Sequence, residues 1–360
     1  MAFSGQKDFL HAQQPKIGVL ITNLGTPEAP TTAALRRYLA QFLSDPRVVE
    51  VPRILWKCIL HAIILRIRPR RSAAAYASIW TDKGSPLIVY TQQQRDALSQ
   101  SLAAIYGEHI VVKFAMRYGN PSIAKTIDTM QKEGVRQLLV LPLYPQYSAA
   151  TTASTFDALA KDFMQRRWLP ALRFINHYHD YPAYIEALAH SIEEHWKWNG
   201  RADKLIISYH GVPLRYLQNG DPYHCECHKT SRLLAEYLGL SSDDYLTTFQ
   251  SRFGRAEWLK PYTDETLKQL PNQGVKSVQV ICPGFSADCL ETIEEIGEEN
   301  RGYFIGMGGE RYEYIPALNA SEEHISVLTS LIKKHLQGWD LPEDNAGTIA
   351  DKYSKRLMVN

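Results

Sequence analysis

The stretch Leu205-Ile206-Ile207-Ser208-Tyr209-His210-Gly211 is a largely apolar run that ends in a histidine and a glycine. A short run of this kind is typical of a buried strand in a parallel sheet. Residues 278–281 have the same character and lead into Cys282-Pro283-Gly284-Phe285-Ser286. Parallel strands of one sheet end at the same edge, so the polar residues that follow these two strands are expected to face each other there.

The rest of the chain repeats this pattern, because short apolar runs alternate with stretches of helical periodicity. The alternation predicts an α/β protein with parallel sheets covered by helices. The expected strands are residues 17–21, 111–116, 138–143, 205–209, 245–249 and 278–281, and the expected helices are residues 32–43, 92–106, 122–132, 184–198 and 231–238.

Two segments resemble each other within the chain. Residues 134–149 and 274–287 both run from Gly-Val and a basic residue through an apolar run to a proline loop. Either the chain has two similar α/β halves or two strand-loop units are alike by chance. Two halves would place the ligand site in the cleft between them, with residues 178–182 as the crossing point. The expected domains are residues 16–182, joined by a C-terminal helix over 322–338, and residues 183–321.

Composition narrows the function classes. The formal net charge of the 360-residue chain is +2, which does not favour nucleic-acid binding. Five scattered cysteines argue for a reducing compartment. Residues 1–14 lack an apolar signal region, and no stretch is long and apolar enough to span a membrane. These features predict a cytoplasmic protein.

Residues 51–67 form an apolar segment with a narrow polar stripe at Arg53, Lys57 and His61, and further arginines follow up to Arg71. One interpretation is a mostly buried helix with a basic end. The other is an apolar lip over a hydrophobic ligand, or a peripheral contact with a membrane surface.

A row of carboxylates follows the strand at 278–281. If Ser286 is the N-cap of an α-helix, Asp288, Glu291, Glu295 and Glu298 fall along one face of it. Such a row suits the passage of a divalent cation, although a solvated acidic face is also consistent with it. His210 can bind a metal or move protons.

Other groups are less decisive. His224-Cys225-Glu226-Cys227-His228 is either half of a metal or iron–sulfur site or a surface loop with reduced thiols. Arginines and hydroxyls after the strands can contact anionic substituents of a ligand, and aromatic or aliphatic residues can form walls for a flat one. The residues of these two kinds are Arg117, Tyr118, Ser251 and Arg252, and Leu24, Tyr147, Trp258 and Phe285.

Together these residues resemble the ferrochelatase family. The resemblance runs from about Lys16 to Leu318 and includes six further motifs in order. The motifs are Asn23-Leu24-Gly25-Thr26-Pro27, Gly84-Ser85-Pro86-Leu87, Tyr144-Pro145-Gln146-Tyr147-Ser148, Gly220-Asp221-Pro222-Tyr223, Phe249-Gln250-Ser251-Arg252-Phe253-Gly254 and Asp288-Cys289-Leu290-Glu291-Thr292, beside Ser208-Tyr209-His210-Gly211.

The resemblance implies two Rossmann-like domains with a porphyrin cleft between them (the chelatase fold). It implies a lyase that inserts Fe²⁺ into protoporphyrin IX with release of two protons, the last step of haem biosynthesis. His210 and Glu291 match the metal-handling pair, and Glu295 and Asp288 match an acidic path leading away from it. Leu24, Arg117, Tyr118 and Trp258 match pocket positions, and Tyr147 and Ser251 stand in matching motifs.

The sequence also departs from some relatives. The position that supplies an internal ligand to a [2Fe–2S] cluster is Ala149, and no cysteine follows Cys289. No cluster and no other permanently bound cofactor are therefore expected, and Fe²⁺ is a substrate. A C-terminal extension that helps some relatives dimerise is missing, so a monomer is expected. A non-catalytic tetrapyrrole carrier, or a chelatase for cobalt or coproporphyrin, remains an alternative.

Overall fold

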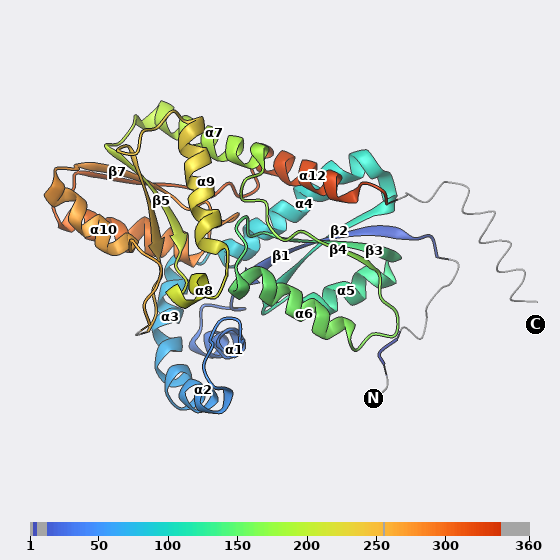
Figure 1. Cartoon of the computed structure of the whole chain (residues 1–360). Coiled ribbons are helices and arrows are strands. Elements are labelled where there is room, and N and C mark those ends of the chain that lie inside the picture. Colours follow the sequence, from blue (N-terminus) through green and yellow to red (C-terminus); the bar gives the residue numbers. More distant parts are fainter. Residues whose placement is uncertain (1–2, 6–12, 255, 340–360) are drawn as a thin grey trace, which may run out of the picture.

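The computed structural model describes residues 3–5, 13–254 and 256–339. Its framework is two four-stranded parallel sheets, one in each half of the molecule (Figure 1). The first sheet has the order β2-β1-β3-β4 and is built from β1 Lys16–Gly25, β2 Ile110–Tyr118, β3 Val135–Pro142 and β4 Ala171–Phe174. The expected α/β architecture, with two parallel sheets flanked by helices, is confirmed, and the expected domain bounds stay a prediction.

The second sheet has the equivalent order, β6-β5-β7-β8. Its strands are β5 Lys204–His210, β6 Tyr245–Gln250, β7 Ser277–Ile281 and β8 Arg311–Ile315. In each sheet the first strand in sequence lies in the middle, next to the third. The matching order agrees with two similar halves.

All six expected strands are present, and two others were missed. Both β4 and β8 lie at the edge of their sheets. β4 has four residues, none of them buried, and β8 alternates between buried and half-exposed positions. β2 and β6 are edge strands too, but β4 and β8 are short and have few buried positions, so neither produces the apolar run that marks a buried strand.

Most helices cover the two sheets, and the others form a separate group beside them. The α-helices are α1 Thr32–Leu43, α2 Arg53–Ile59, α3 Leu65–Ile79, α4 Pro86–Tyr106, α5 Ile123–Lys132, α6 Ser154–Phe163, α7 Pro182–Asn199, α8 Leu214–Gln218, α9 Tyr223–Tyr237, α10 Thr263–Gln269, α11 Arg301–Gly306 and α12 Glu322–Leu336. The π-helices are η1 Leu60–Ile64, η3 Ala149–Ala153 and η5 Glu291–Asn300, and the short 3-10 turns are η2 Gly107–His109 and η4 Leu270–Gln273.

One hydrophobic cluster joins the two halves. It contains Ile17 and Leu139 of the first sheet, Leu205 and Ile207 of the second, and buried side chains of the helices between them. The C-terminal helix α12 contributes Leu328 to this cluster and packs against α4, β3 and α7. The end of the chain therefore returns to the first half, and the two sheets share much of their apolar core.

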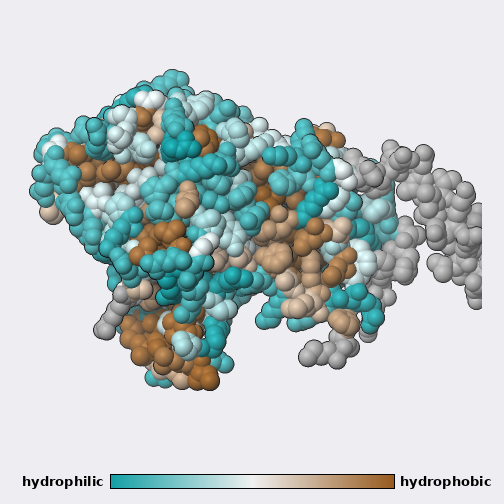
Figure 2. Space-filling model, viewed as in Figure 1, coloured by the Kyte–Doolittle hydropathy of each residue, from teal (hydrophilic) through white to brown (hydrophobic). Residues whose placement is uncertain are grey.

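The segment α2-η1-α3 projects from the body of the molecule. Ile54 and Ile67 are 85% and 71% exposed, whereas Trp56 and Leu60 pack inward. Figure 2 shows hydrophobic side chains gathered at this tip. The mostly buried helix considered from the sequence is therefore wrong, because the segment exposes much of its apolar surface. The projecting segment α2-η1-α3 is called the lip below, and its role over a ligand or at a membrane stays a prediction. No helix in the described part of the chain combines the length and apolarity needed to cross a bilayer.

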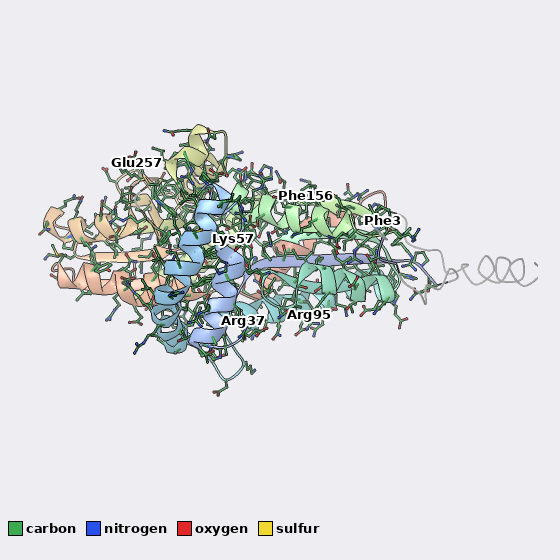
Figure 3. All side chains as sticks on the ribbon, turned by 90° about the horizontal axis from the view of Figure 1, so that it is seen from below. Phe3, Arg37, Lys57, Arg95, Phe156 and Glu257 are labelled. Atoms are coloured by element: carbon green, nitrogen blue, oxygen red, sulfur yellow. The ribbon has the colours of Figure 1, made fainter. Side chains whose placement is uncertain are left out.

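The projecting helices lie across the middle of the molecule. Seen from below, the helices that carry Arg37 and Lys57 cross between the first sheet on one side and the C-terminal half on the other (Figure 3). Arg215 of α8 pairs with Glu50 at 3.0 Å, and the Tyr216 hydroxyl donates to the Arg47 carbonyl at 2.9 Å. The loop between α1 and α2, which leads into the projecting segment, is thus attached to α8 of the second half.

Candidate active site

His210 is the last residue of β5, at the carboxyl end of the second sheet. Its Nδ1 lies 2.7 Å from the carbonyl oxygen of Gly211. A carbonyl can only accept, so Nδ1 carries the proton and Nε2 of the neutral ring keeps its lone pair. The next residue must be small, because a Cβ on Gly211 would lie 2.8 Å from the Gln250 carbonyl oxygen and 3.2 Å from the Trp258 ring. Trp258 therefore lies directly beside the histidine segment.

Gln250 connects His210 to the acidic helix. The two residues are paired in register across β5 and β6. The Gln250 amide donates to the backbone carbonyl of Glu291 at 2.8 Å, and its own oxygen accepts from Ser208 Oγ at 2.9 Å. This side chain fixes the first turn of η5 against the carboxyl ends of β5 and β6, and so brings Glu291 to the edge of the sheet where His210 ends.

The acidic segment is a π-helix and begins later than expected. Residues 283–289 are turns, and the helical region begins at Leu290, so the N-cap expected at Ser286 is wrong. A π-helix closes i→i+5 hydrogen bonds and takes more residues per turn than an α-helix. Residues four apart stay on one side, whereas residues seven apart diverge. Glu291 and Glu295 are accordingly both half-buried, and Glu298 is exposed.

Glu295 has an unusual environment. Its carboxylate accepts a hydrogen bond from Ser251 Oγ, at the end of β6. Burial is the main cause that raises its pKa to about 7; the Ser251 hydrogen bond lowers it and the nearby Glu291 charge raises it. Ser251 itself has a φ of 65°, a left-handed conformation that non-glycine residues rarely adopt. A carboxyl with this pKa can both accept and release protons near neutral pH.

Asp288 lies apart from this pair. It precedes the helix, is 4% exposed, and accepts hydrogen bonds from Thr292 Oγ1, the Tyr314 hydroxyl and Asn319 Nδ2 at 2.9, 2.6 and 2.7 Å. The Ala317 amide approaches it at 3.4 Å. Both carboxylate oxygens are occupied by protein donors, an arrangement that anchors the start of η5 to the segment after β8. The structure therefore does not bring Asp288 into line with Glu291 and Glu295.

Glu291 lies close enough to Tyr38 of α1 and Tyr76 of α3 for its charge to act on both side chains. Burial is the main cause that raises the pKa of Tyr38 and Tyr76, and the Glu291 charge adds to both shifts. Leu24, at the end of β1, and Leu290 pack into the same apolar cluster as these tyrosines. The end of β1 in the first half therefore meets the start of η5 in the second.

A cation–π contact joins the lip to the loop after β6. The Arg68 guanidinium of α3 lies 4.3 Å from the ring centroid of Phe253. The indole N–H of Trp258 donates to the Phe253 carbonyl at 2.9 Å. The loop that starts at Ser251 is thus held between the lip and the end of β5.

Arg117 and Tyr118 are committed to a buried polar network. Arg117 pairs with Asp45 at 2.5 Å, and its Nε donates to Ser154 at 2.8 Å. Tyr118 is fully buried and donates to the same Asp45 carboxylate at 2.7 Å. Neither side chain has the free charge or hydroxyl that a direct anion contact needs. Asp45 and Ser154 were missed because nothing in their local sequence marks them.

Tyr147 lies on the loop after β3 and is half-buried. Its backbone N–H donates to the Glu226 carboxylate at 2.7 Å, which ties this loop of the first half to α9 of the second.

The segment around Glu226 is the first two turns of α9, so the surface loop considered from the sequence is wrong. Cys225 is exposed and Cys227 is buried.

The structure thus brings together most of the residues expected at the site. His210, Trp258, Ser251, Glu291 and Glu295 belong to connected segments at the carboxyl ends of β5 and β6, and Leu24 approaches from β1. Arg117 and Tyr118 end β2 of the first sheet, Tyr147 lies on the loop after β3, and Asp288 is turned to a different set of partners. Gln250, Tyr38 and Tyr76 were missed as site residues, although Gln250 stands at a strand end.

Comparison with known proteins gives a consistent result. The model of the family described as Ferrochelatase matches residues 16–336. A ferrochelatase of Idiomarina loihiensis is 67% identical over 343 residues, which is 95% of this chain and 94% of that protein. A ferrochelatase of Marinobacter nauticus is 64% identical over 352 residues, 98% of this chain and 95% of that protein.

A solved structure supports the fold. "SirB from Bacillus subtilis with Fe3+" aligns with a TM-score of 0.51 at 11% identity, and the alignment covers 91% of this chain and 99% of that one. At this identity the likeness is one of fold alone, and the fold is that of the chelatases.

Proposed function

This chain belongs to the ferrochelatase family, and from that premise we propose how its own residues carry out the reaction. The protein is a lyase that inserts Fe²⁺ into protoporphyrin IX to form protohaem, with release of two protons, in haem biosynthesis. The observation that supports the residue assignment is the link from His210 through Gln250 to Glu291 at the end of the second sheet.

His210 and Glu291 are proposed to carry the chemistry at the ring. A free-base porphyrin must lose two pyrrole protons and buckle so that its nitrogen lone pairs point out of the ring plane. The exposed lone pair of His210 Nε2 can accept one proton or bind the metal, since Nδ1 is held by Gly211. The Glu291 carboxylate can replace water on Fe²⁺ as the ion arrives.

Glu295 is proposed to relay protons and metal between Glu291 and solvent. Its pKa of about 7 lets it take up a proton and release it again at neutral pH. It lies four residues after Glu291, on the same side of η5, and is oriented by Ser251. Asp288 is proposed to support this pair by fixing the start of η5, since protein donors already occupy its oxygens.

The porphyrin is proposed to lie in a cleft between the two halves and beneath the lip. Leu24, Trp258 and Tyr147 would form apolar walls, and Ser251 would lie at the edge near Glu295. Arg117 is proposed to meet a propionate only by exchanging its Asp45 partner, and Tyr118 to position Arg117. Apolar contact over the whole ring face would provide the energy that distorts it.

Further properties are proposed on similar grounds. A cytoplasmic monomer that touches membranes peripherally fits the exposed apolar residues Ile54 and Ile67 beside clustered arginines. No [2Fe–2S] cluster is proposed, and no permanently bound cofactor is proposed to take part in the reaction. Cys225 and Cys227 are two positions apart on α9, one exposed and the other buried, so they diverge and do not converge on one cluster.

The function is tested by steady-state metal insertion under anaerobic conditions. Protoporphyrin IX should be converted with Fe²⁺, and faster than coproporphyrin is. Conversion of coproporphyrin alone would contradict the assigned substrate, and binding of porphyrin without any insertion would indicate a carrier.

A further inference from the structure

Three possible metal ligands meet away from the site described above. His177 and His179 lie on the crossing segment between β4 and α7, and Glu226 lies on α9 of the second half. One ligand atom of each residue lies within 4.8 Å of the other two. Among the described residues, no other group of three histidine, cysteine or acidic side chains comes this close.

The geometry is close to that of a coordination sphere. His177 Nδ1 lies 2.6 Å from Glu226 Oε1, and His179 Nδ1 lies 3.3 Å from Glu226 Oε2. Ligand bonds of about 2.0–2.2 Å to Zn²⁺ place neighbouring ligand atoms of a tetrahedral site roughly 3.3–3.6 Å apart. The spacing of His179 and Glu226 matches this, and the spacing of His177 and Glu226 would have to widen when a cation binds.

His179 supplies an independent observation. The residue is 5% exposed, and its Nδ1 has no hydrogen-bond partner although it faces the Glu226 carboxylate. A buried polar atom without a partner is costly, and such atoms often mark a site for an unseen ion.

We propose that His177, His179 and Glu226 form a second binding site, for a borderline divalent cation of the Zn²⁺ class. Two imidazoles and one carboxylate suit such ions better than Mg²⁺ or Ca²⁺, which prefer oxygen ligands. The side chain of His177 is 47% exposed, which gives the ion an entry path and leaves room for water as a further ligand. The site is separate from His210 and Glu291 and does not depend on their proposed roles.

The contacts of Glu226 suggest what the cation does. Glu226 also accepts from the backbone N–H of Tyr147, on the loop after β3. Thr230, one turn further along α9, donates to the His179 carbonyl at 2.8 Å and accepts from Gln146 at 3.1 Å. A bound cation would therefore clamp three segments together: the loop after β3, the crossing segment and α9. Its effect should be structural, a stabilisation of the contact between the two halves.

The competing explanation is an unmetallated histidine–glutamate pair. His177 alone can donate from Nδ1 to Glu226, and His190 and Glu323 form such a pair at 3.3 Å elsewhere on the surface. That second pair has no third ligand in reach, so His190→Ala is a matched control. The difference between the two sites is the buried, unpartnered nitrogen of His179.

The test is a Zn²⁺ titration of the full chain after treatment with a chelator, followed by calorimetry and by the melting temperature. The wild type and His190→Ala should each bind one more equivalent than His179→Ala, and Zn²⁺ should raise their Tm but not that of His179→Ala. His210→Ala should retain this equivalent, which separates the new site from the catalytic one.

Absorption spectroscopy at the zinc edge provides a second measurement on His210→Ala, which keeps all three proposed ligands, in case His179→Ala folds poorly. Two imidazole ligands should be counted when His210→Ala is loaded with Zn²⁺. Equal stoichiometry in the wild type and His179→Ala, or no imidazole in the spectrum of His210→Ala, would mean a histidine–glutamate hydrogen bond only and would overturn the proposal.

Discussion

Ser251, immediately after β6, donates a hydrogen bond from its hydroxyl to the carboxylate of Glu295 on η5. This contact joins the loop that carries Trp258 to the acidic helix. It also opposes the effect of burial on the pKa of Glu295, because hydrogen bonding favours the ionised form and burial disfavours it. The protonation state of the proposed relay thus depends on one serine.

Replacing Ser251 by alanine should make the enzyme less active in weak acid. Loss of the hydrogen bond raises the pKa of Glu295 further, so the acidic limb of the pH–rate profile should move to higher pH. Turnover at pH 7 should fall roughly tenfold. Ser191→Ala removes a hydroxyl bonded within α7 and serves as the control. An unshifted profile would show that Glu295 does not act as a proton relay.

Glu295→Gln should change how stability depends on pH. The fold raises the pKa of Glu295 from 4.5 to about 7, so it favours the protonated form. The stabilisation of the fold by protonated Glu295 is fully present below pH 4.5 and is lost as pH rises through about 7. Between pH 4.5 and pH 8, the free energy of unfolding of the wild type should fall by up to about 3 kcal/mol relative to that of Glu295→Gln. Urea unfolding of both proteins at several pH values measures this, and a constant difference would rule out the shifted pKa.

His210→Ala and Glu291→Gln should each lower turnover by about 10²–10⁴-fold. Both changes remove a group proposed to act on metal or protons, whereas Glu295→Gln should mainly weaken the apparent affinity for Fe²⁺. Porphyrin fluorescence titrations should show binding retained in all three variants, because the apolar walls provide it. Small, equal losses for Glu291→Gln and Glu295→Gln would mean that η5 presents only a solvated acidic face.

Asp45→Ala should destabilise the protein by about 3 kcal/mol. The change leaves the Arg117 guanidinium, whose side chain is 16% exposed, without its partner, and also removes the acceptor of Tyr118. Asp157→Ala breaks the exposed pair with Arg47 and should cost less than about 1 kcal/mol. Urea unfolding compares the two, and similar losses would contradict the buried network.

The lip should bind anionic membranes. Ile54 and Ile67 are exposed beside clustered arginines, so the wild type should sediment with anionic liposomes at low salt. Replacing both by aspartate should abolish sedimentation. Trp198→Asp alters an apolar side chain that is 80% exposed on α7 and should have no effect. Equal binding by the lip variant and the control would place the contact elsewhere.

Much of the fold can be predicted from the sequence, because a short run of neighbouring residues is enough to identify a central strand. Runs such as residues 205–209 and 278–281 are apolar enough to identify central strands, since only a strand buried on both faces needs them. The edge strands β4 and β8 carry no such run and were not found. The residues at strand ends, among them His210 and Ser251, could be named in advance because parallel strands present their ends at one edge.

The tertiary structure alone decided how those residues are used. Whether Arg117 is free or paired depends on Asp45, which is 72 positions away in the chain. Whether Asp288 continues the acidic row depends on where η5 begins and on its i→i+5 hydrogen bonds, which local periodicity does not reveal. The meeting of His177, His179 and Glu226 is likewise a product of folding. The sequence determines which chemical groups exist and which strands carry them; long-range contacts determine which charges are neutralised, buried or left with a lone pair.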